Sequence, residues 1–407
     1  MESRQHISER PPGGRHNVSE VFTAFLKLGL TSFGGPIAHL GYFRNEFVEK
    51  RQWVNDGQFA QLLALCQFLP GPASSQLGFS LGLLRGGWLG ALAAFVAFTL
   101  PSALLLFLFA LVAPQLSGPV GSAVIHGLKL VALVVVAHGL LGMAGKLCTD
   151  MTRRGIAVFS AVSIIIIGGV WLQIAIILVG AFLGLLLLHD ESDLPESALP
   201  VRYGRKTGWS LLAVFILLLA GLPLFAHGSN ALLAVFEAFY RAGALVFGGG
   251  HVVLPFLEQA LVGPGWLARG DFMAGYGAAQ AVPGPMFSLS AYLGAHLPGS
   301  NGGLLGAGVA LAAIFLPGFL LVSSALPLWH TLSAHPASAR SIAGINASVV
   351  GILAAALYDP IWVSAVHGVS DIVIAMVGFV FLFVWRISAL FVVLWCVVAS
   401  ISVALFL

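Results

Sequence analysis

Two long uncharged runs constrain this chain more than any other feature. Residues 155–188 form 34 positions without a charged side chain, and residues 387–407 form another 21. A helix needs roughly 20 apolar residues to cross a bilayer. Backbone groups in lipid must be hydrogen-bonded within the protein, which leaves only helices and closed barrels, and the alternating strand pattern of a barrel is missing. The sequence therefore predicts an all-α polytopic membrane protein, with further spans at 88–113 and 304–329.

Composition agrees with this class and excludes others. Charged residues make up 9% of the chain, against about 25% in a soluble domain. The net charge of +3 is spread over loops and indicates no nucleic-acid site. The three cysteines, Cys66, Cys148 and Cys396, are too far apart for a CxxC metal motif or a disulfide framework. We therefore expect no metal and no cofactor.

The chain also contains an internal duplication. FLKLGLTSFGG at 25–35 aligns with FYRAGALVFGG at 239–249, and five of the eleven positions are identical. The alignment continues from QFLPGP at 67–72 to QAVPGP at 280–285. A repeat of this length predicts two homologous halves.

The boundaries follow from charge and proline content. Residues 1–18 are polar and, because Lys27 interrupts the next stretch, they make a poor cleavable signal, so we expect a cytoplasmic tail. The first transmembrane repeat then covers 19–188, a charged linker 189–206, an extra transmembrane crossing 207–226 and the second repeat 227–407.

Charge in the loops predicts that the second repeat is inverted. Loops 36–56, 84–87 and 146–154 carry seven Lys and Arg residues, whereas the matching loops 250–269, 297–303 and 363–371 carry only Arg269. Basic loops stay on the cytoplasmic side, so the second set of loops is expected outside. Inverted repeats place a substrate site near the midplane, where broken helices meet. The alternative is two parallel copies whose loop charges have drifted.

Two cations occupy equivalent positions within the repeat. Lys27 lies seven residues beyond Glu20, about 10 Å deeper along a helix, and Arg241 is its counterpart. A cation inside the membrane costs roughly 2.5–3.5 kcal/mol and needs a partner or a purpose. Two cations facing one central site, with Glu237 nearby, suit a dianion. The alternative is a snorkelling Lys27, or one paired with Glu237.

Each cation precedes a glycine-rich break that should end or bend its helix. The breaks are Phe33, Gly34 and Gly35 in the first half and Phe247, Gly248 and Gly249 in the second. Irregular backbone at membrane depth is tolerated where it lines a cavity. The alternative is close helix packing through small residues.

A second motif in each half should start a helix. The Pro-Gly-Pro turns are Pro70, Gly71 and Pro72, and Pro283, Gly284 and Pro285. Serines follow each turn, and hydroxyls with free N–H groups at a helix start suit an oxyanion. They are Ser74 and Ser75 in the first half and Ser288 in the second. The alternative is that these serines are N-caps.

Further candidates are less specific. Gln67 and Gln280 precede the turns and would either contact a ligand or bridge helices. Lys129, its counterpart Asn346, and His251 complete the candidate set. Intramembrane carboxylates are scarce, which disfavours a cation transporter, whereas histidines such as His39 could relay protons. No nucleotide-binding or catalytic motif appears, so we expect no enzyme.

The paired motifs, a basic residue, Phe-Gly-Gly and then Pro-Gly-Pro, resemble the long two-domain form of the chromate ion transporter family. The resemblance covers nearly the whole chain and implies a bacterial inner-membrane protein that exports chromate and confers resistance to it. It extends to Lys27 and Arg241 with the two breaks and the two turns. The second break reads Phe-Gly-Gly-Gly where the first ends in Pro36, so the two halves need not contact the ion equally.

Two alternatives stay open at this level. Sulfate or another tetrahedral oxyanion shares the charge and shape of chromate. A non-transporting membrane scaffold or a membrane-embedded enzyme is the alternative from another class. The expected partners are chromate or sulfate and the lipid bilayer, and a homodimer is compatible with a transporter of this size.

Overall fold

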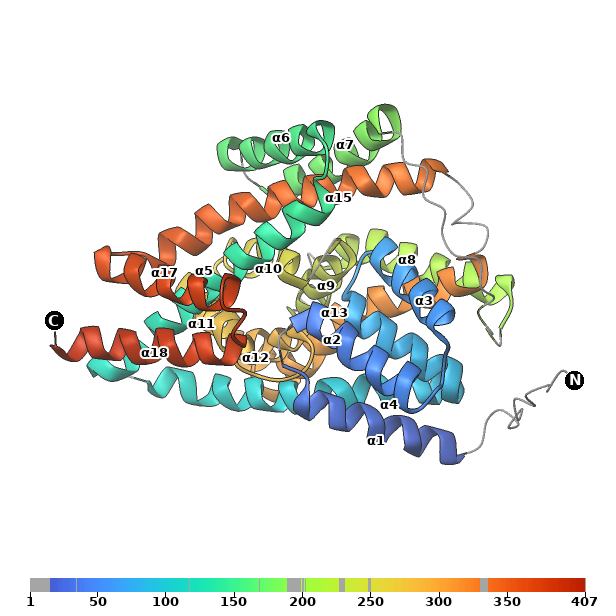
Figure 1. The fold of residues 1–407 in the computed structure, drawn as a ribbon, viewed down its shortest axis with the longest axis horizontal. Helices are drawn as coiled ribbons and strands as arrows, with labels where there is room; N and C mark the ends of the chain where they lie inside the picture. Colours follow the sequence, from blue (N-terminus) through green and yellow to red (C-terminus); the bar gives the residue numbers. More distant parts are fainter. Residues whose placement is uncertain are drawn as a thin grey trace, which may run out of the picture.

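The fold is all-helical. The computed structural model describes residues 15–33, 35–116, 118–167, 169–188, 199, 201, 203–226, 231–247, 250–329 and 336–406, and none of these residues lies in a strand (Figure 1). Within these residues, six helices are long and apolar enough to cross a membrane. They begin at residues 73, 118, 205, 303, 337 and 389, which includes the spans expected at 88–113, 304–329 and 387–407. The predicted polytopic helical class is confirmed.

The first half runs from α1 to α7, and α8 follows it. The helices of this half include α1 (Arg15–Thr31), α2 (Gly35–Arg44), η1 (Asn45–Lys50), α3 (Asp56–Phe68), α4 (Ala73–Val112), α5 (Gly118–Leu147), α6 (Met151–Ile167) and α7 (Val170–Leu187), and α8 covers Arg205–Phe225. The uncharged run 155–188 is therefore shared by two helices, separated at Gly169, which has φ +95°. The segment expected to add a crossing, 207–226, is almost entirely α8.

The second half repeats the order of the first. It contains α9 (Ala231–Ala244), η3 (Gly250–Val252), α10 (Val253–Leu261), α11 (Arg269–Ala279), η4 (Met286–Ser288), α12 (Leu289–Ala295), α13 (Gly303–Ala325), α15 (Pro336–Ala356), η7 (Leu357–Trp362), α17 (Val369–Phe383) and α18 (Ala389–Phe406). In the aligned register α1 matches α9, α3 matches α11, and α5 matches α15. The last two helices of each half, α6 with α7 and α17 with α18, also correspond.

A folded-back helix pair follows each Pro-Gly-Pro turn. Helix α4 is interrupted at Gly87, where φ is +64° and ψ is −158°. A Cβ atom added to Gly82 would lie 2.6 Å from the carbonyl oxygen of Gly90, a contact that a continuous helix cannot make over eight residues. In the second half a Cβ atom on Gly294 of α12 would lie 2.3 Å from the carbonyl oxygen of Gly306 of α13. Each turn is thus followed by a short arm that returns against a long one.

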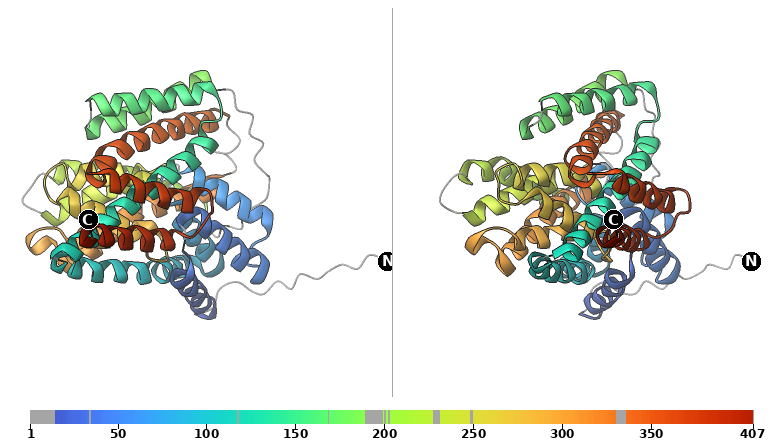
Figure 2. Two further views of the ribbon diagram at one scale, coloured as in Figure 1. Left: turned by 60° about the vertical axis from the view of Figure 1, so that its left-hand side comes forward. Right: turned by 90° about the vertical axis from the view of Figure 1, so that its left-hand side faces the viewer.

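The two halves exchange helices. Helix α5 of the first half packs against α17 and α18 of the second, while α15 packs against α6 and α7 of the first (Figures 1 and 2). The contacts are equivalent in detail, because Gly127 of α5 meets the backbone of Val397 and Gly344 of α15 meets Gly180. The helices α5 and α15 are therefore packed mainly against helices of the opposite half.

Candidate functional site

Both Phe-Gly-Gly motifs interrupt the backbone helix as expected. Helix α1 ends at Thr31 and α2 begins at Gly35, whose φ is +74°. In the second half α9 ends at Ala244 and the next helical turn begins at Gly250. Gly34, Gly248 and Gly249 lie outside the described residues. The flanking Phe33 and Phe247 are half-buried.

Both Pro-Gly-Pro motifs are turns that start a helix, as predicted. Gly71 and Gly284 have φ +126° and +98°, values that favour glycine. A helix begins immediately after each turn, α4 at Ala73 and η4 at Met286. Of the flanking prolines, Pro72, Pro283 and Pro285 are buried and Pro70 is half-buried.

The two motifs meet across the halves in a reciprocal pattern. The N–H of Gly71 donates to the carbonyl oxygen of Val246 at 2.7 Å, and the N–H of Gly284 donates to the carbonyl oxygen of Ser32 at 3.0 Å. Ser32 and Val246 are equivalent positions, each directly before the phenylalanine of a break. Each turn is therefore held by the break of the opposite half. We call these four residues the central crossing.

The residue that follows a helix proline in each half packs against a turn glycine of the crossing. Ser102 and Gly318 directly follow Pro101 of α4 and Pro317 of α13. A Cβ atom on Gly284 would lie 2.9 Å from the Ser102 hydroxyl, and one on Gly71 would lie 3.0 Å from the Gly318 Cα. The crossing is too closely packed for a side chain at either turn glycine.

None of the serines after the turns makes a capping hydrogen bond, although Ser288 occupies the N-cap position of α12. Neither α4 nor α12 has a side-chain cap hydrogen bond. The Ser288 hydroxyl lies 2.7 Å from the Ser102 hydroxyl, which itself donates to the carbonyl oxygen of Thr99 at 2.9 Å. Ser288 is therefore the donor to Ser102. Ser74 and Ser75 are buried on the first turn of α4.

Several buried polar atoms around the crossing make no hydrogen bond within the described residues. They are Ser32 Oγ, His39 Nδ1, Ser75 Oγ, Gln76 Oε1 and Thr99 Oγ1. Each belongs to a segment that makes or adjoins the crossing, and a buried polar group without a partner costs about 1–3 kcal/mol. Buried atoms of this kind mark a place for water or a polar ligand.

His39 and Gln76 of the first half donate hydrogen bonds to backbone carbonyl oxygens in and beside the crossing. The imidazole Nε2 of His39, which is fully buried, donates to the carbonyl oxygen of Ser32 at 3.2 Å, so the neutral ring leaves Nδ1 as an acceptor. The amide of Gln76 donates to the carbonyl oxygens of Pro70 at 2.9 Å and Gly318 at 3.1 Å. Sequence reasoning missed Ser32, Gln76, Thr99 and Ser102, because only the fold brings α4 against the breaks.

The two equivalent cations have different surroundings. Arg241 is half-buried and its Nε lies 3.0 Å from a carboxylate oxygen of the buried Glu237, one turn earlier on α9. Lys27 is exposed on α1, and its ammonium makes no ion pair with an acid in the described part of the chain. Glu237 is therefore the partner of Arg241, and the interpretation in which it pairs with Lys27 is not observed.

The remaining candidates are dispersed. Gln67 is exposed on α3, whereas the amide of Gln280 donates to the carbonyl oxygen of Tyr276 at 3.4 Å. Lys129 of α5 lies against the start of α11, since a Cβ atom on Gly270 would be 3.4 Å from its ammonium. Its counterpart Asn346 has a buried Oδ1 without a hydrogen bond.

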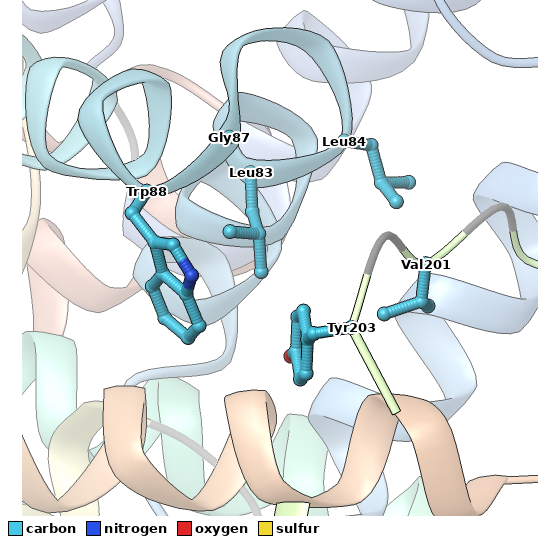
Figure 3. A pocket seen from close by; sticks show the side chains of 6 residues that line it. All are labelled: Leu83, Leu84, Gly87, Trp88, Val201 and Tyr203. Carbon is cyan, nitrogen blue, oxygen red and sulfur yellow. The ribbon is translucent and has the colours of Figure 1, made fainter. Parts of the chain in front are cut away.

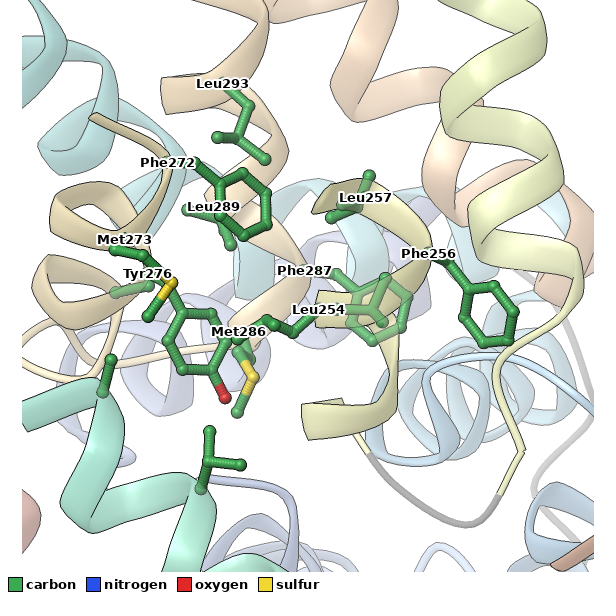
Figure 4. Close-up of a cluster of buried hydrophobic side chains, with 14 of the residues drawn as sticks. Leu254, Phe256, Leu257, Phe272, Met273, Tyr276, Met286, Phe287, Leu289 and Leu293 are labelled. Atoms are coloured by element: carbon green, nitrogen blue, oxygen red, sulfur yellow. The ribbon is translucent and has the colours of Figure 1, made fainter. Parts of the chain in front are cut away.

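His251 lies behind the second break, in contact with the core. Its Nδ1 is 2.7 Å from the hydroxyl of Tyr276, a fully buried side chain of α11. Figure 4 shows Tyr276 beside Met273 and Met286 in this apolar cluster, with Phe287 packed next to Leu254. Val246 of the crossing thus belongs to the large hydrophobic core that lies mainly in the second half.

An apolar pocket lies elsewhere, between the bend of α4 and the segment before α8. It is lined by Leu83, Leu84, Gly87, Trp88, Val201 and Tyr203 (Figure 3). The Tyr203 hydroxyl donates to the carbonyl oxygen of Ser323 at 2.6 Å, and none of the described residues that line the pocket is charged. Such a lining suits an apolar group rather than an oxyanion.

Comparison with known proteins decides the family. The chromate transporter family matches residues 19–185 and again residues 233–401. The chain belongs to the chromate transporter family. The repeated match confirms the two homologous halves, and this family consists of transporters rather than enzymes. The chain is accordingly a multi-pass membrane protein of a transporter family.

Relatives of known name support the assignment. A chromate transport protein of Pseudomonas aeruginosa is 28% identical over 377 residues, spanning 90% of this chain and 87% of that protein. A probable chromate transport protein of Synechococcus elongatus is 30% identical over 84% of each chain. The uncharacterized transporter YwrA of Bacillus subtilis is 31% identical over 150 residues, which cover 37% of this chain and 80% of YwrA. No solved structure matches.

Proposed function

We propose that this protein is a secondary transporter that exports chromate across the bacterial inner membrane and so confers chromate resistance. The observation that carries the proposal is the central crossing, where each half binds the break of the other through a turn glycine. Discontinuous helices that meet in this way are the usual seat of substrate sites in transporters with repeats. Export and resistance follow from the family resemblance, and the lack of a nucleotide motif favours secondary transport.

The crossing offers hydrogen-bond donors for a tetrahedral dianion. The first turn of α4 presents N–H groups that no helical carbonyl reaches, with the positive end of the helix dipole behind them. The unpartnered hydroxyls of Ser75, Ser32 and Thr99 supply further donors in the same region. Hydroxyls and backbone N–H groups bind an oxyanion without adding a formal charge.

Cations supply the compensating charge. In this structure Glu237 neutralises Arg241, so an arriving dianion would compete with that carboxylate for the guanidinium. Lys27 is free of ion pairs within the described residues and exposed, which suits attraction of the anion toward the first break.

The proposal is tested by chromate flux in proteoliposomes that contain the purified protein. We expect saturable uptake of labelled chromate by the wild type and a loss of at least about tenfold in Arg241→Gln, because a hydrogen bond to a charged group contributes about 1.5–3 kcal/mol. Lys27→Gln should reduce uptake as well. The matched control is Lys206→Gln, an exposed cation at the start of α8, which should leave flux unchanged.

Two outcomes would contradict the proposal. Wild-type vesicles without chromate flux would exclude transport, and full activity of both Arg241→Gln and Lys27→Gln would remove these cations from the mechanism. Addition of excess sulfate separates the substrates, since chromate and sulfate carry the same charge and shape. If sulfate abolishes chromate flux and is itself transported faster, the protein is a sulfate transporter.

A further inference from the structure

A cluster of metal-binding groups lies apart from the central crossing, at the contact between the two halves. His126 belongs to α5 of the first half, whereas Asp371 lies in the first turn of α17 and His367 two residues before that helix begins. Their ligand atoms all lie within 4.8 Å of one another, and His126 Nε2 is 2.7 Å from Asp371 Oδ1. The two imidazole rings are stacked with centroids 5.3 Å apart.

We propose that His126, His367 and Asp371 form a binding site for a divalent first-row transition metal such as Zn²⁺. Two imidazoles and one carboxylate, with the remaining positions taken by water, are the ligand set of open zinc sites. Imidazole ligands favour Zn²⁺, Ni²⁺ or Cu²⁺ over Mg²⁺ and Ca²⁺, which prefer oxygen. The absence of CxxC spacing says nothing against this site, because its ligands are histidines and an aspartate brought together by folding.

The carboxylate is already oriented for a metal. Its Oδ2 accepts the backbone N–H groups of His367 at 2.8 Å and Gly368 at 3.1 Å, which leaves Oδ1 directed at His126. Hydrogen bonds that fix the second carboxylate oxygen are the usual support of a metal-binding aspartate. The positive dipole end of α17 opposes a cation here, and the charge of Asp371 offsets it.

The site is open to a metal ion from solvent, and its ligands can move to bind one. Asp371 is 7% exposed, whereas His367 is exposed and the His126 side chain is 25% exposed, so the site opens to one side. Metal bonds of about 2.0–2.2 Å require ligand atoms roughly 3.3 Å apart. Metal binding would replace the hydrogen bond between His126 Nε2 and Asp371 Oδ1, so their 2.7 Å separation would widen, while the exposed ring of His367 can rotate toward the ion. A bound metal would tie α5 to α17 and thereby stabilise the exchange of helices between the halves.

The test is metal binding to tag-free protein after treatment with a chelator, and it does not depend on chromate transport. Titration with Co²⁺, followed by its visible absorption and then by competition with Zn²⁺, should show one site per chain. His126→Ala and His367→Ala should each weaken binding at least about tenfold. Zn²⁺ should raise the melting temperature of the wild type but not of these variants.

His296→Ala is the matched control, because His296 is half-buried and bonded only to its own helix turn. It should bind Co²⁺ as the wild type does. His367→Ala removes an exposed side chain, so loss of binding in that variant cannot be attributed to a disrupted core. The site is disproved if the wild type takes up no stoichiometric Co²⁺ or Zn²⁺, or if both His126→Ala and His367→Ala bind unchanged.

Discussion

Single residues at the crossing serve conformation rather than charge. Gly71 and Gly284 combine a positive φ with a neighbour about 3 Å from any added Cβ atom, so the position excludes side chains for two independent reasons. Arg241 and Lys27 share a repeat position but only Arg241 has an ion-pair partner in the described structure. The duplication preserved the backbone contacts of the crossing more closely than its charges.

Alanine at either turn glycine should therefore impair the protein. A side chain at φ +126° or +98° costs roughly 1–3 kcal/mol of strain, before the added Cβ displaces Gly318 or Ser102. We expect Gly71→Ala and Gly284→Ala each to lower the melting temperature and to abolish chromate flux in proteoliposomes. Gly142→Ala, at a glycine with no neighbouring atom within 4 Å, should behave as the wild type. Normal stability of both turn variants would show that the crossing tolerates side chains.

The helix breaks and helix starts at these residues could be predicted from the sequence, but the side chains that pack against them could not. Glycine and proline act locally, so the helix breaks at Gly35 and the helix starts after Pro72 and Pro285 could be read directly. Ser102 and Thr99 lie in the middle of an apolar helix, and only tertiary packing brings them to Ser288. The pairing of Arg241 with Glu237 could be predicted from their spacing of four residues, which makes them neighbours on one helix. The internal repeat instead suggested that Arg241 and Lys27 face a shared site.

At the scale of elements, exchanged helices join the halves. Gly344 of α15 meets Gly180 of α7, and Gly127 of α5 meets Val397 of α18. Small residues allow helices in a membrane to approach closely enough for van der Waals packing, which is the main attraction available there. Loops and spans can be located from hydropathy, but the partner of a helix cannot, because every apolar face is equally suited to lipid or to another helix.

Replacing these glycines with alanine should weaken the packing between helices of opposite halves. An added Cβ on Gly344 would lie 2.0 Å from the Gly180 carbonyl oxygen and one on Gly127 2.7 Å from the Val397 Cα. Such overpacking typically costs 1–3 kcal/mol. We expect Gly344→Ala and Gly127→Ala to lower the melting temperature in detergent, whereas Gly145→Ala, which has open space around it, should not. Equal melting temperatures for all three variants would refute the close packing.

At the scale of the whole molecule, exchange makes the two halves one functional unit. The relative YwrA is matched over 80% of its length by only 37% of this chain, so it is about half as long. A half-length chain built on this plan would lack the helices that its partner half supplies, and two copies would have to provide them. Because one chain carries both halves here, the two halves can differ in sequence, as they do at Lys27 and Arg241.

The orientation of the halves in the membrane stays a prediction from loop charge. Several basic residues of the first half are already paired with acids, including Arg85 with Glu20 at 3.0 Å and Arg44 with Asp56 at 2.8 Å. This pairing does not remove the bias, because the positive-inside rule counts Lys and Arg and gives acids little weight. Crossing by the apolar α8 would then place the second set of loops on the opposite side.

Cysteine labelling decides between inverted and parallel repeats. Gln52 and Ala268 are exposed in corresponding loops, while the native Cys66, Cys148 and Cys396 are buried and should contribute little background. In intact cells a membrane-impermeant maleimide should label Ala268→Cys but reach Gln52→Cys only after permeabilisation. Equal labelling of both variants in intact cells would mean parallel repeats, and the reciprocal crossing would then need a two-fold axis along the membrane normal. Inversion would place that axis in the membrane plane, as in transporters built from inverted repeats, so that the two breaks enter the crossing from opposite sides of the membrane.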